Sequence, residues 1–311
     1  MSGAKPNSTL LYLSFAAVYL IWGTSFAASK LVMHDLPPLL AQSVRFLIAG
    51  IGLCAVALWR GNRIPFVVKE WQHFAVMGLF LVMAASGLNA LAIRYVSSSE
   101  SALLNVSAAF WIPLLGTLGK RGHRLNTRST VGLVLGLSGV IFLMWPKGGF
   151  SLTNLGWQLV ILLACFGWAC GTLYYRRVRS MTPALMFTAL EMVCGGLGLG
   201  ILGLCFGDTQ HWHLTAQSLG GLFFLTVFSS GIAYSAFAYL MRNTTPIRLS
   251  TYAYVNPAVA ALIGWAVLGE HLSLVQIVGM AIILTGVVLV SIPDSRGALT
   301  QIDAPPSEAP P

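Results

Sequence analysis

Apolar residues in this chain form long blocks, and the polar stretches between them are short. Most blocks reach the length of about 20 residues that a helix needs to cross the hydrocarbon core of a bilayer. Hydropathy and helix-breaking residues together predict an all-α membrane protein of ten transmembrane helices. These helices are expected near residues 10–31, 38–59, 72–93, 97–119, 128–145, 155–175, 183–206, 217–241, 247–268 and 273–292.

The composition excludes a soluble globular protein. Apolar residues make up 56% of the chain and charged residues 9%, whereas about 25% of the residues in soluble domains are charged. The net charge of +9 does not indicate a nucleic-acid partner, because the basic residues lie in the gaps between apolar blocks and not on one folded surface. The expected partner is therefore the lipid bilayer, with no nucleic acid.

The Lys and Arg residues alternate between the gaps, which predicts the orientation in the membrane. One set of alternate gaps carries 14 of them and the other set carries three, Lys30, Arg94 and Lys147. Basic residues concentrate on the cytoplasmic side of membrane proteins. Both termini are therefore predicted to be cytoplasmic.

The chain also contains an internal repeat. Trp22 matches Trp168 and Arg45 matches Glu191 at an offset of 146 residues, and LNTRSTVGLVLGLSGV matches LSLVQIVGMAIILTGV at an offset of 147 residues. The repeats are predicted at 10–146 and 155–292, followed by a disordered cytoplasmic tail at 297–311. Each repeat holds five predicted helices, an odd number, so the second repeat must enter the membrane from the opposite side.

Inverted repeats generally place a substrate site near the bilayer midplane, where the two halves meet, and transport follows from rocking one half against the other. This architecture predicts a transporter of small molecules. An importer or exchanger on the same fold is an alternative, and a membrane-embedded enzyme or a purely structural scaffold are further ones. An enzyme would need a cluster of nucleophile, acid and base or metal ligands. We find none in the sequence, and we expect no cofactor or metal.

Three stretches resemble the EamA family of the drug/metabolite transporter superfamily, and in detail its YedA-type exporters. They are YLIWGTSF in the first predicted helix, PPLLAQSVRFLIAG in the second, and STYAYVNPAVAALIGWAVLGEHLS followed by GMAIILTGVVLV near the end. The resemblance covers nearly the whole chain except the tail. It implies a ten-helix fold in the bacterial inner membrane and export of small metabolites, amino acids or toxic compounds from the cytoplasm.

Arg45 and Glu191 are the clear ionisable residues within the predicted helices. An ionisable side chain at a helix centre costs about 2.5 to 3.5 kcal/mol on insertion scales, so it usually faces a cavity or a partner. The two residues could pair with each other, or Glu191 could carry protons as the coupling ion while Arg45 holds a substrate carboxylate. The structural alternatives are an ion pair without transport function, or an Arg45 that extends to the cytoplasmic side.

Polar and aromatic residues at depth form the second group of candidates for a substrate-binding cavity. Amide side chains inside a bilayer hydrogen-bond across helices or bind substrate, and aromatic rings stack on organic or cationic ligands. Helix–helix contact is the simpler explanation for any single member, whereas the whole set predicts a cavity. The set comprises Trp22, Asn89, Asn105, Trp111, Trp168, Tyr234, Tyr252 and Asn256.

Overall fold

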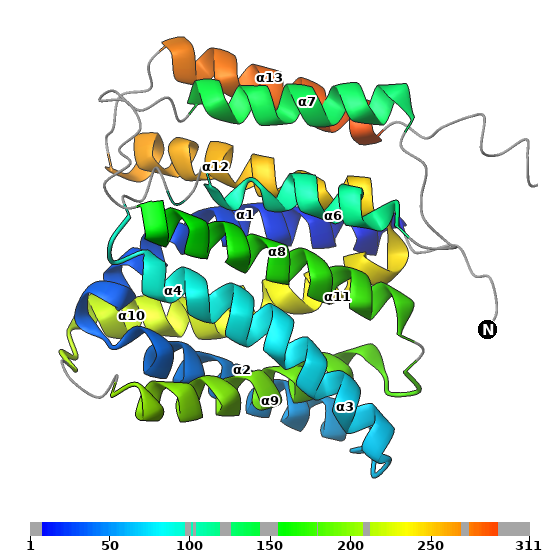
Figure 1. Cartoon of the computed structure of the whole chain (residues 1–311), viewed down its shortest axis with the longest axis vertical. Helices are drawn as coiled ribbons and strands as arrows, with labels where there is room; N and C mark the ends of the chain where they lie inside the picture. Colours follow the sequence, from blue (N-terminus) through cyan, green and yellow to red (C-terminus); the bar gives the residue numbers. More distant parts are fainter. Residues whose placement is uncertain are drawn as a thin grey trace, which may run out of the picture.

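The computed structural model describes residues 8–96, 101, 104–118, 126–143, 155–178, 180–207, 212–268 and 274–291. The secondary structure of these residues is entirely helical (Figure 1). The elements are α1 (Ser8–Asp35), α2 (Pro38–Trp59), α3 (Val68–Met77), η1 (Gly78–Gly87), α4 (Leu88–Ala92), α6 (Ala108–Gly116), α7 (Thr127–Leu143), α8 (Leu155–Arg177), α9 (Ala184–Cys205), α10 (Ala216–Phe224), η3 (Leu225–Ala233), α11 (Tyr234–Asn243), α12 (Pro246–Leu268) and α13 (Leu274–Ser291). The predicted tail at 297–311 lies outside the described residues.

Six helices in the described part are long and apolar enough to cross a membrane. They are Ser8–Asp35, Pro38–Trp59, Val68–Ala92, Leu155–Arg177, Ala184–Cys205 and Ala216–Asn243. Their outer surfaces carry exposed leucine, isoleucine and phenylalanine side chains, as helices that face lipid do. The ends of these helices agree with the predicted ranges to within a few residues.

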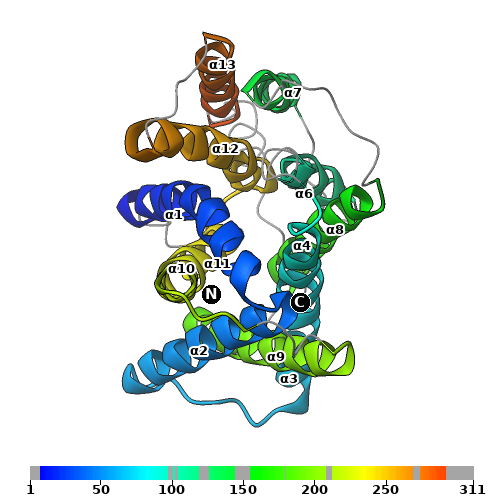
Figure 2. The same cartoon turned by 90° about the vertical axis from the view of Figure 1, so that its left-hand side faces the viewer.

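The helices form a bundle with two antiparallel pairs at opposite edges. Figures 1 and 2 show α7 and α13 together at one edge and α2 and α9 together at the other, in views turned by 90°. Between these edges, α1 packs against α12 and against the rod made of α10, η3 and α11. In a matching arrangement, α8 packs against α6 and against the rod made of α3, η1 and α4.

The contacts between α2 and α9 are reciprocal with respect to the repeat. A Cβ atom built on Gly50 would lie 2.9 Å from Val193, and one built on Gly196 would lie 3.0 Å from Leu47. Gly196 and Val193 are the residues that stand 146 positions after Gly50 and Leu47. Reciprocal contacts of this kind are the signature of a two-fold axis.

The same reciprocity occurs between α7 and α13. A Cβ atom built on Gly132 would lie 2.9 Å from the Gly286 carbonyl oxygen. One built on Gly139 would lie 2.8 Å from the Gly279 carbonyl oxygen. Gly132 is equivalent to Gly279, and Gly139 to Gly286, at the offset of 147 residues. Glycines let helix backbones approach this closely, so a larger residue at these positions would push the two helices apart.

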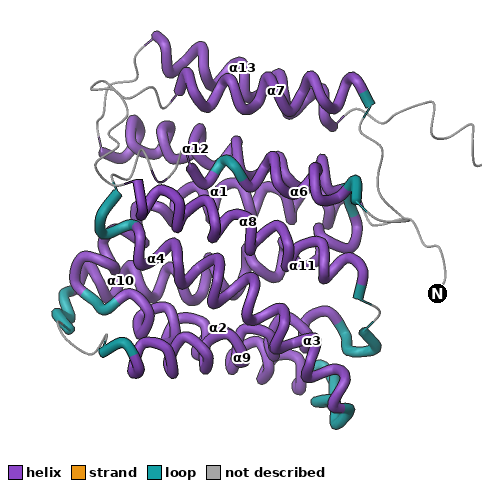
Figure 3. Tube along the Cα trace, viewed as in Figure 1, coloured by secondary structure: helices purple, strands orange, loops and turns teal. Residues whose placement is uncertain are grey.

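Two of the predicted helices differ from regular α-helices in the middle. The tube in Figure 3 runs continuously from α3 to α4 and from α10 to α11, yet η1 and η3 within these rods are wide π-helical segments. Such segments are rare and often lie at functional sites. Gly78 and Leu225, where they begin, are 147 residues apart, so both copies of the repeat carry the same departure.

The helix expected at 97–119 is interrupted. Turn conformation at Val106 and Ser107 precedes α6. The Asn105 side chain donates hydrogen bonds to the Ser101 carbonyl and accepts one from Asn89. Asn105 therefore makes a tertiary contact directly before the turn that interrupts the expected helix.

Candidate functional site, a cavity between the helix bundles

A cavity of about 180 Å³ lies among α1, α2, the η1–α4 and η3–α11 segments, α8 and α12. All of the residues predicted for a substrate site line it, except Trp111 and Glu191. The predicted residues in its wall are Trp22, Arg45, Asn89, Asn105, Trp168, Tyr234, Tyr252 and Asn256. Both halves of the repeat therefore contribute side chains to one cavity.

An aromatic cluster centred on Trp22 forms part of the wall. The Trp22 ring centroid lies 5.4 Å from those of Trp168 and Tyr252, 5.1 Å from that of Phe237 and 6.4 Å from that of Tyr234. Most of these pairs are edge-to-face, the geometry that the quadrupoles of aromatic rings favour. Trp22 and Trp168 are equivalent in the repeat, so the cluster brings together the corresponding position of each half.

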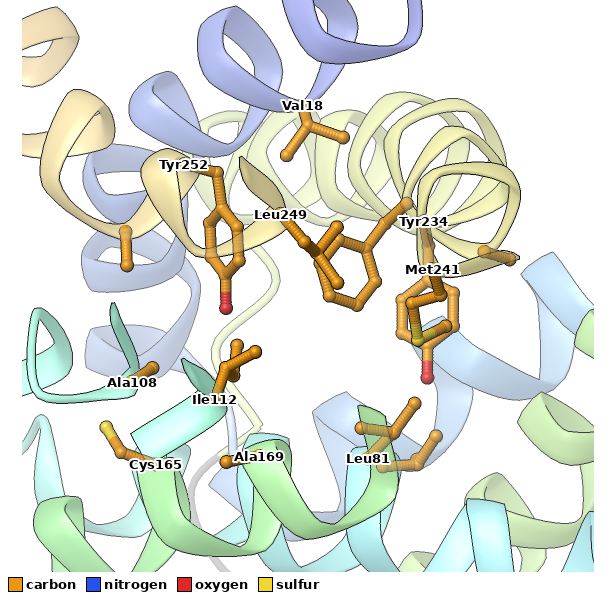
Figure 4. Close-up of a cluster of buried hydrophobic side chains, with 14 of the residues drawn as sticks. Val18, Leu81, Ala108, Ile112, Cys165, Ala169, Tyr234, Met241, Leu249 and Tyr252 are labelled. Carbon is orange, nitrogen blue, oxygen red and sulfur yellow. The ribbon is translucent and has the colours of Figure 1, made fainter. Parts of the chain in front are cut away.

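The tyrosine rings of this cluster extend across the space between helices. Figure 4 shows Tyr252 directed from α12 toward the part of α8 that carries Cys165 and Ala169, with the Tyr234 ring extending in a similar direction from α11. The Tyr234 hydroxyl and the Trp168 Nε1 are buried and form no hydrogen bond. These two polar groups are covered by the surrounding side chains and do not face the cavity.

Arg45 is buried, with 9% of its surface exposed, and it binds only neutral groups. Its Nε donates to Ser230 Oγ at 2.8 Å, Nη2 donates to Ser229 Oγ at 3.0 Å, and Nη1 donates to Gln42 Oε1 at 3.2 Å. A guanidinium group has five N–H donors, so one donor remains on each Nη. Among the residues that line the cavity, Arg45 is the charged one.

The two serines that hold Arg45 come from η3. Ser229 and Ser230 are consecutive in the wide π-helical segment, and the Ser229 carbonyl also accepts a hydrogen bond from Trp22 Nε1 at 3.2 Å. The π-helical segment thus fixes both the cation and one ring of the aromatic cluster. Sequence reasoning missed these serines, because hydroxyl side chains are common in membrane helices and only their distance from Arg45 in the fold distinguishes them.

Glu191 lies in α9, fully buried and outside the cavity wall. Neither of its carboxyl oxygens forms a hydrogen bond, and it forms no ion pair with Arg45. The Tyr234 hydroxyl lies beside this carboxyl group. Tyr234 therefore stands between the cavity, which it lines, and the acid behind it.

The amides and the remaining tryptophan complete the predicted set. Asn89 Nδ2 donates to Asn105 Oδ1 at 2.8 Å, so this pair joins two helices as well as lining the cavity. Trp111 does not reach the cavity. Its ring packs against Phe166 at a centroid distance of 5.4 Å, so Trp111 belongs to a neighbouring helix contact.

The two ends of the cavity differ. Toward the C-terminal end of α1 it reaches Met33 and Ile93. Toward the opposite end of the bundle, Tyr19 and Thr251 are joined by a hydrogen bond of 2.5 Å, and Arg176 donates to the Met241 carbonyl. These bonds link α1 to α12 and α8 to α11 at that end.

The model of the EamA-like transporter family matches residues 9–145 and again residues 155–292. The chain is 34% identical over 289 residues to the uncharacterized inner membrane transporter YedA of Escherichia coli strain K12, a match that covers 91% of this chain and 90% of that protein. It is 25% identical to the uncharacterized transporter YvbV of Bacillus subtilis strain 168, covering 94% of each.

A solved crystal structure shares the fold. It superposes with a TM-score of 0.77 and 20% sequence identity, covering 96% of this chain and 100% of that chain. At this identity the likeness concerns the arrangement of the helices alone.

Proposed function

This chain belongs to the EamA-like transporter family, and from that premise we propose that it is a secondary transporter that exports small organic metabolites, such as amino acids, or drugs by alternating access. The family membership gives a multi-pass membrane protein with a transporter role. The export direction, the substrate and the coupling ion are the parts that we add.

The proposal includes ten membrane spans, arranged as inverted repeats at 10–146 and 155–292, with both termini on the cytoplasmic side of the bacterial inner membrane. The reciprocal contacts of Gly50 with Val193 and of Gly196 with Leu47 support the inversion. A two-fold axis that lies in the membrane plane makes equivalent helices run antiparallel, as α2 and α9 do. The charge difference between alternate gaps supports the orientation.

The observation that carries the proposal is the cavity between the halves, with a single cation in an aromatic and amide wall. A carboxylate that accepted the remaining N–H donors of Nη1 and Nη2 would bind Arg45 in the two-bond geometry typical of guanidinium–carboxylate pairs. The rings of Trp22, Trp168 and Tyr252 would contact the apolar part of the same molecule. We therefore favour carboxylate-bearing substrates over cationic ones.

Glu191 takes the second role in this mechanism, that of proton carrier. A buried carboxylate without an ion-pair partner is unstable in apolar surroundings, and protonation removes its charge. Tyr234 contacts both Glu191 and the cavity, so a charge bound near Arg45 would act on the carboxyl group through a short path. Proton uptake by Glu191 and substrate binding at Arg45 would then be coupled.

The shape of the cavity fits one state of an alternating-access cycle. It reaches Met33 and Ile93 at the end that the charge pattern assigns to the outside, whereas Tyr19 and Thr251 join α1 to α12 at the other end. Breaking the latter contact while closing the outer end would expose the same site to the cytoplasm.

Flux in proteoliposomes tests the proposal. Purified protein is reconstituted, and uptake is measured for amino acids, aromatic carboxylates and cationic drugs, with and without an imposed pH gradient. We expect flux for one or more carboxylate compounds, increased by the gradient. Absence of flux for every compound, together with no growth protection in cells, would overturn the proposal, and flux confined to cationic drugs would overturn the substrate class.

A further inference from the structure

A second pocket, of about 430 Å³, lies at one end of the bundle, away from the central cavity. One wall is formed by the connection between α2 and α3 and by the first turns of α3. The other wall is formed by residues 181–183, which connect α8 to α9. Arg63, Lys69 and His73 supply nitrogen groups to this pocket.

The acid in the pocket is already engaged. Glu70 accepts hydrogen bonds from the Thr182 hydroxyl at 2.7 Å, from the Met181 backbone N–H at 3.3 Å and from the Ser180 hydroxyl. These bonds fasten α3 to the α8–α9 connection. Glu70 forms no ion pair with either cation of the pocket.

Arg63 and Lys69 are not engaged by Glu70. Within the described part of the chain, neither side chain forms a hydrogen bond or an ion pair, and both residues are exposed. His73 uses Nδ1 in a hydrogen bond of 2.7 Å with the Tyr174 hydroxyl, which leaves Nε2 facing outward from that contact. With histidine neutral, two cations and one engaged carboxylate give the pocket a net charge of about +1 at neutral pH.

Large apolar side chains are exposed on the segments that form this pocket: Met181 lines it, Phe66 stands between lining residues in the sequence, and Trp59 ends α2 just before this connection. The exposed fraction is 96% for Phe66, 94% for Met181 and 86% for Trp59. Trp59 is the last residue of α2, and Phe66 and Met181 lie in the connections that follow α2 and α8, which are long and apolar enough to cross a membrane. Aromatic and apolar side chains just beyond such helices are expected at the level of the lipid headgroups. A ligand that matches this surface has an anionic group for the cations and apolar chains for the rim.

The corresponding turn in the second repeat shows that the fold does not need these cations. There the connection between α9 and α10 is fastened by Thr215 Oγ1, which donates to Asp35 Oδ2 at 2.7 Å, and by the His213 N–H, which donates to the Asp35 carbonyl at 2.9 Å. The segment 206–216 contains no Lys or Arg. The interlock thus forms without cations, so Arg63 and Lys69 are available for a ligand.

We propose that this pocket binds the phosphate group of an anionic phospholipid in the adjacent leaflet. Arg63 and Lys69 contact the phosphate oxygens, His73 Nε2 lies beside them, and the acyl chains lie along Phe66 and Met181. Basic pockets between membrane helices are known to accept anionic headgroups. The site is separate from the central cavity, and its test does not depend on transport.

Native mass spectrometry of the full chain in detergent tests the site. The protein is titrated with dioleoyl phosphatidylglycerol or with dioleoyl phosphatidylcholine, and the apparent dissociation constants are compared. We expect the wild-type chain to prefer phosphatidylglycerol. In the double variant Arg63→Gln/Lys69→Gln we expect phosphatidylglycerol to bind about 10- to 30-fold more weakly, with phosphatidylcholine unchanged.

A matched control separates the pocket from general surface charge. The double variant Arg60→Gln/Arg128→Gln removes the same charge from exposed positions outside the pocket, and it should keep the wild-type preference. The swap Arg63→Lys/Lys69→Arg keeps the charge and should also retain binding. An equal loss in the pocket and control variants would overturn the proposal. Displacement of the lipid by millimolar inorganic phosphate would overturn the assignment to a phospholipid.

Discussion

Replacement of Arg45 gives a direct test of the substrate class. Three of its five N–H groups are held by Ser230, Ser229 and Gln42, so a carboxylate can accept at most the two that remain. A hydrogen bond to a charged group contributes about 1.5 to 3 kcal/mol. Arg45→Lys keeps the charge but loses the planar fork. Arg45→Lys should therefore lose one hydrogen bond to the carboxylate and bind it about 10- to 150-fold more weakly.

Isothermal titration calorimetry on the purified chain measures this effect. The ligands are a carboxylate that the flux panel selects and its primary amide, which differ only in the group that Arg45 would bind. The wild-type chain should bind the acid more tightly than the amide. Arg45→Gln should bind both with similar weak affinity, because it has lost the cation and both donors.

Arg94→Gln is the matched control. Arg94 is an exposed arginine that donates to the carbonyls of Met33 and Leu36 and does not line the cavity. This variant should retain the preference for the acid. If Arg45→Gln bound the acid as tightly as the wild type while its thermal unfolding was unchanged, the role of Arg45 would be refuted.

Three further predictions concern the aromatic wall, the helix packing and the acid. Trp22→Ala and Trp168→Ala should each raise the KM for the transported compound about 2- to 10-fold, since an aromatic contact contributes about 0.5 to 1.5 kcal/mol; an unchanged KM in both would place the substrate elsewhere. Gly132→Val should lower the free energy of unfolding by about 1 to 3 kcal/mol in thermal or denaturant unfolding, because its side chain would overlap the backbone of α13. Gly156→Val, at a position with open space around it, is the control, and equal losses in the two would contradict the packing argument. Glu191→Gln should fold normally and abolish the stimulation of flux by a pH gradient, and a stimulation equal to that of the wild type would exclude Glu191 as the proton carrier.

The sequence was most informative where the repeat was visible. The matches of Trp22 with Trp168 and of Arg45 with Glu191 selected four positions, of which three line the cavity and the fourth, Glu191, is fully buried. The lengths of the apolar blocks gave the six long apolar helices to within a few residues. This signal is strong because the bilayer allows few alternatives to a hydrophobic helix of fixed length.

Side-chain direction was not predictable, because helices that are apolar all round carry no amphipathic pattern that marks a face. Glu191 and Arg45 occupy equivalent positions, yet only Arg45 reaches the cavity. Two partners of Arg45, Ser229 and Ser230, stand 184 and 185 positions after it in the chain, and no spacing rule connects them with Arg45. The π-helical segments were invisible for the same reason, since their composition is that of an ordinary membrane helix.

The central claim is that substrate passes through the cavity between the two halves. In a variant with all five cysteines replaced by alanine, Ser86→Cys places one thiol in the cavity wall, and Leu197→Cys places one on the outer surface of α9. Flux of the selected carboxylate is measured in proteoliposomes before and after reaction with a methanethiosulfonate reagent. We predict that labelling at position 86 stops flux, that the substrate slows this labelling, and that labelling at position 197 has no effect. Full flux through protein that is completely labelled at position 86 would contradict the account.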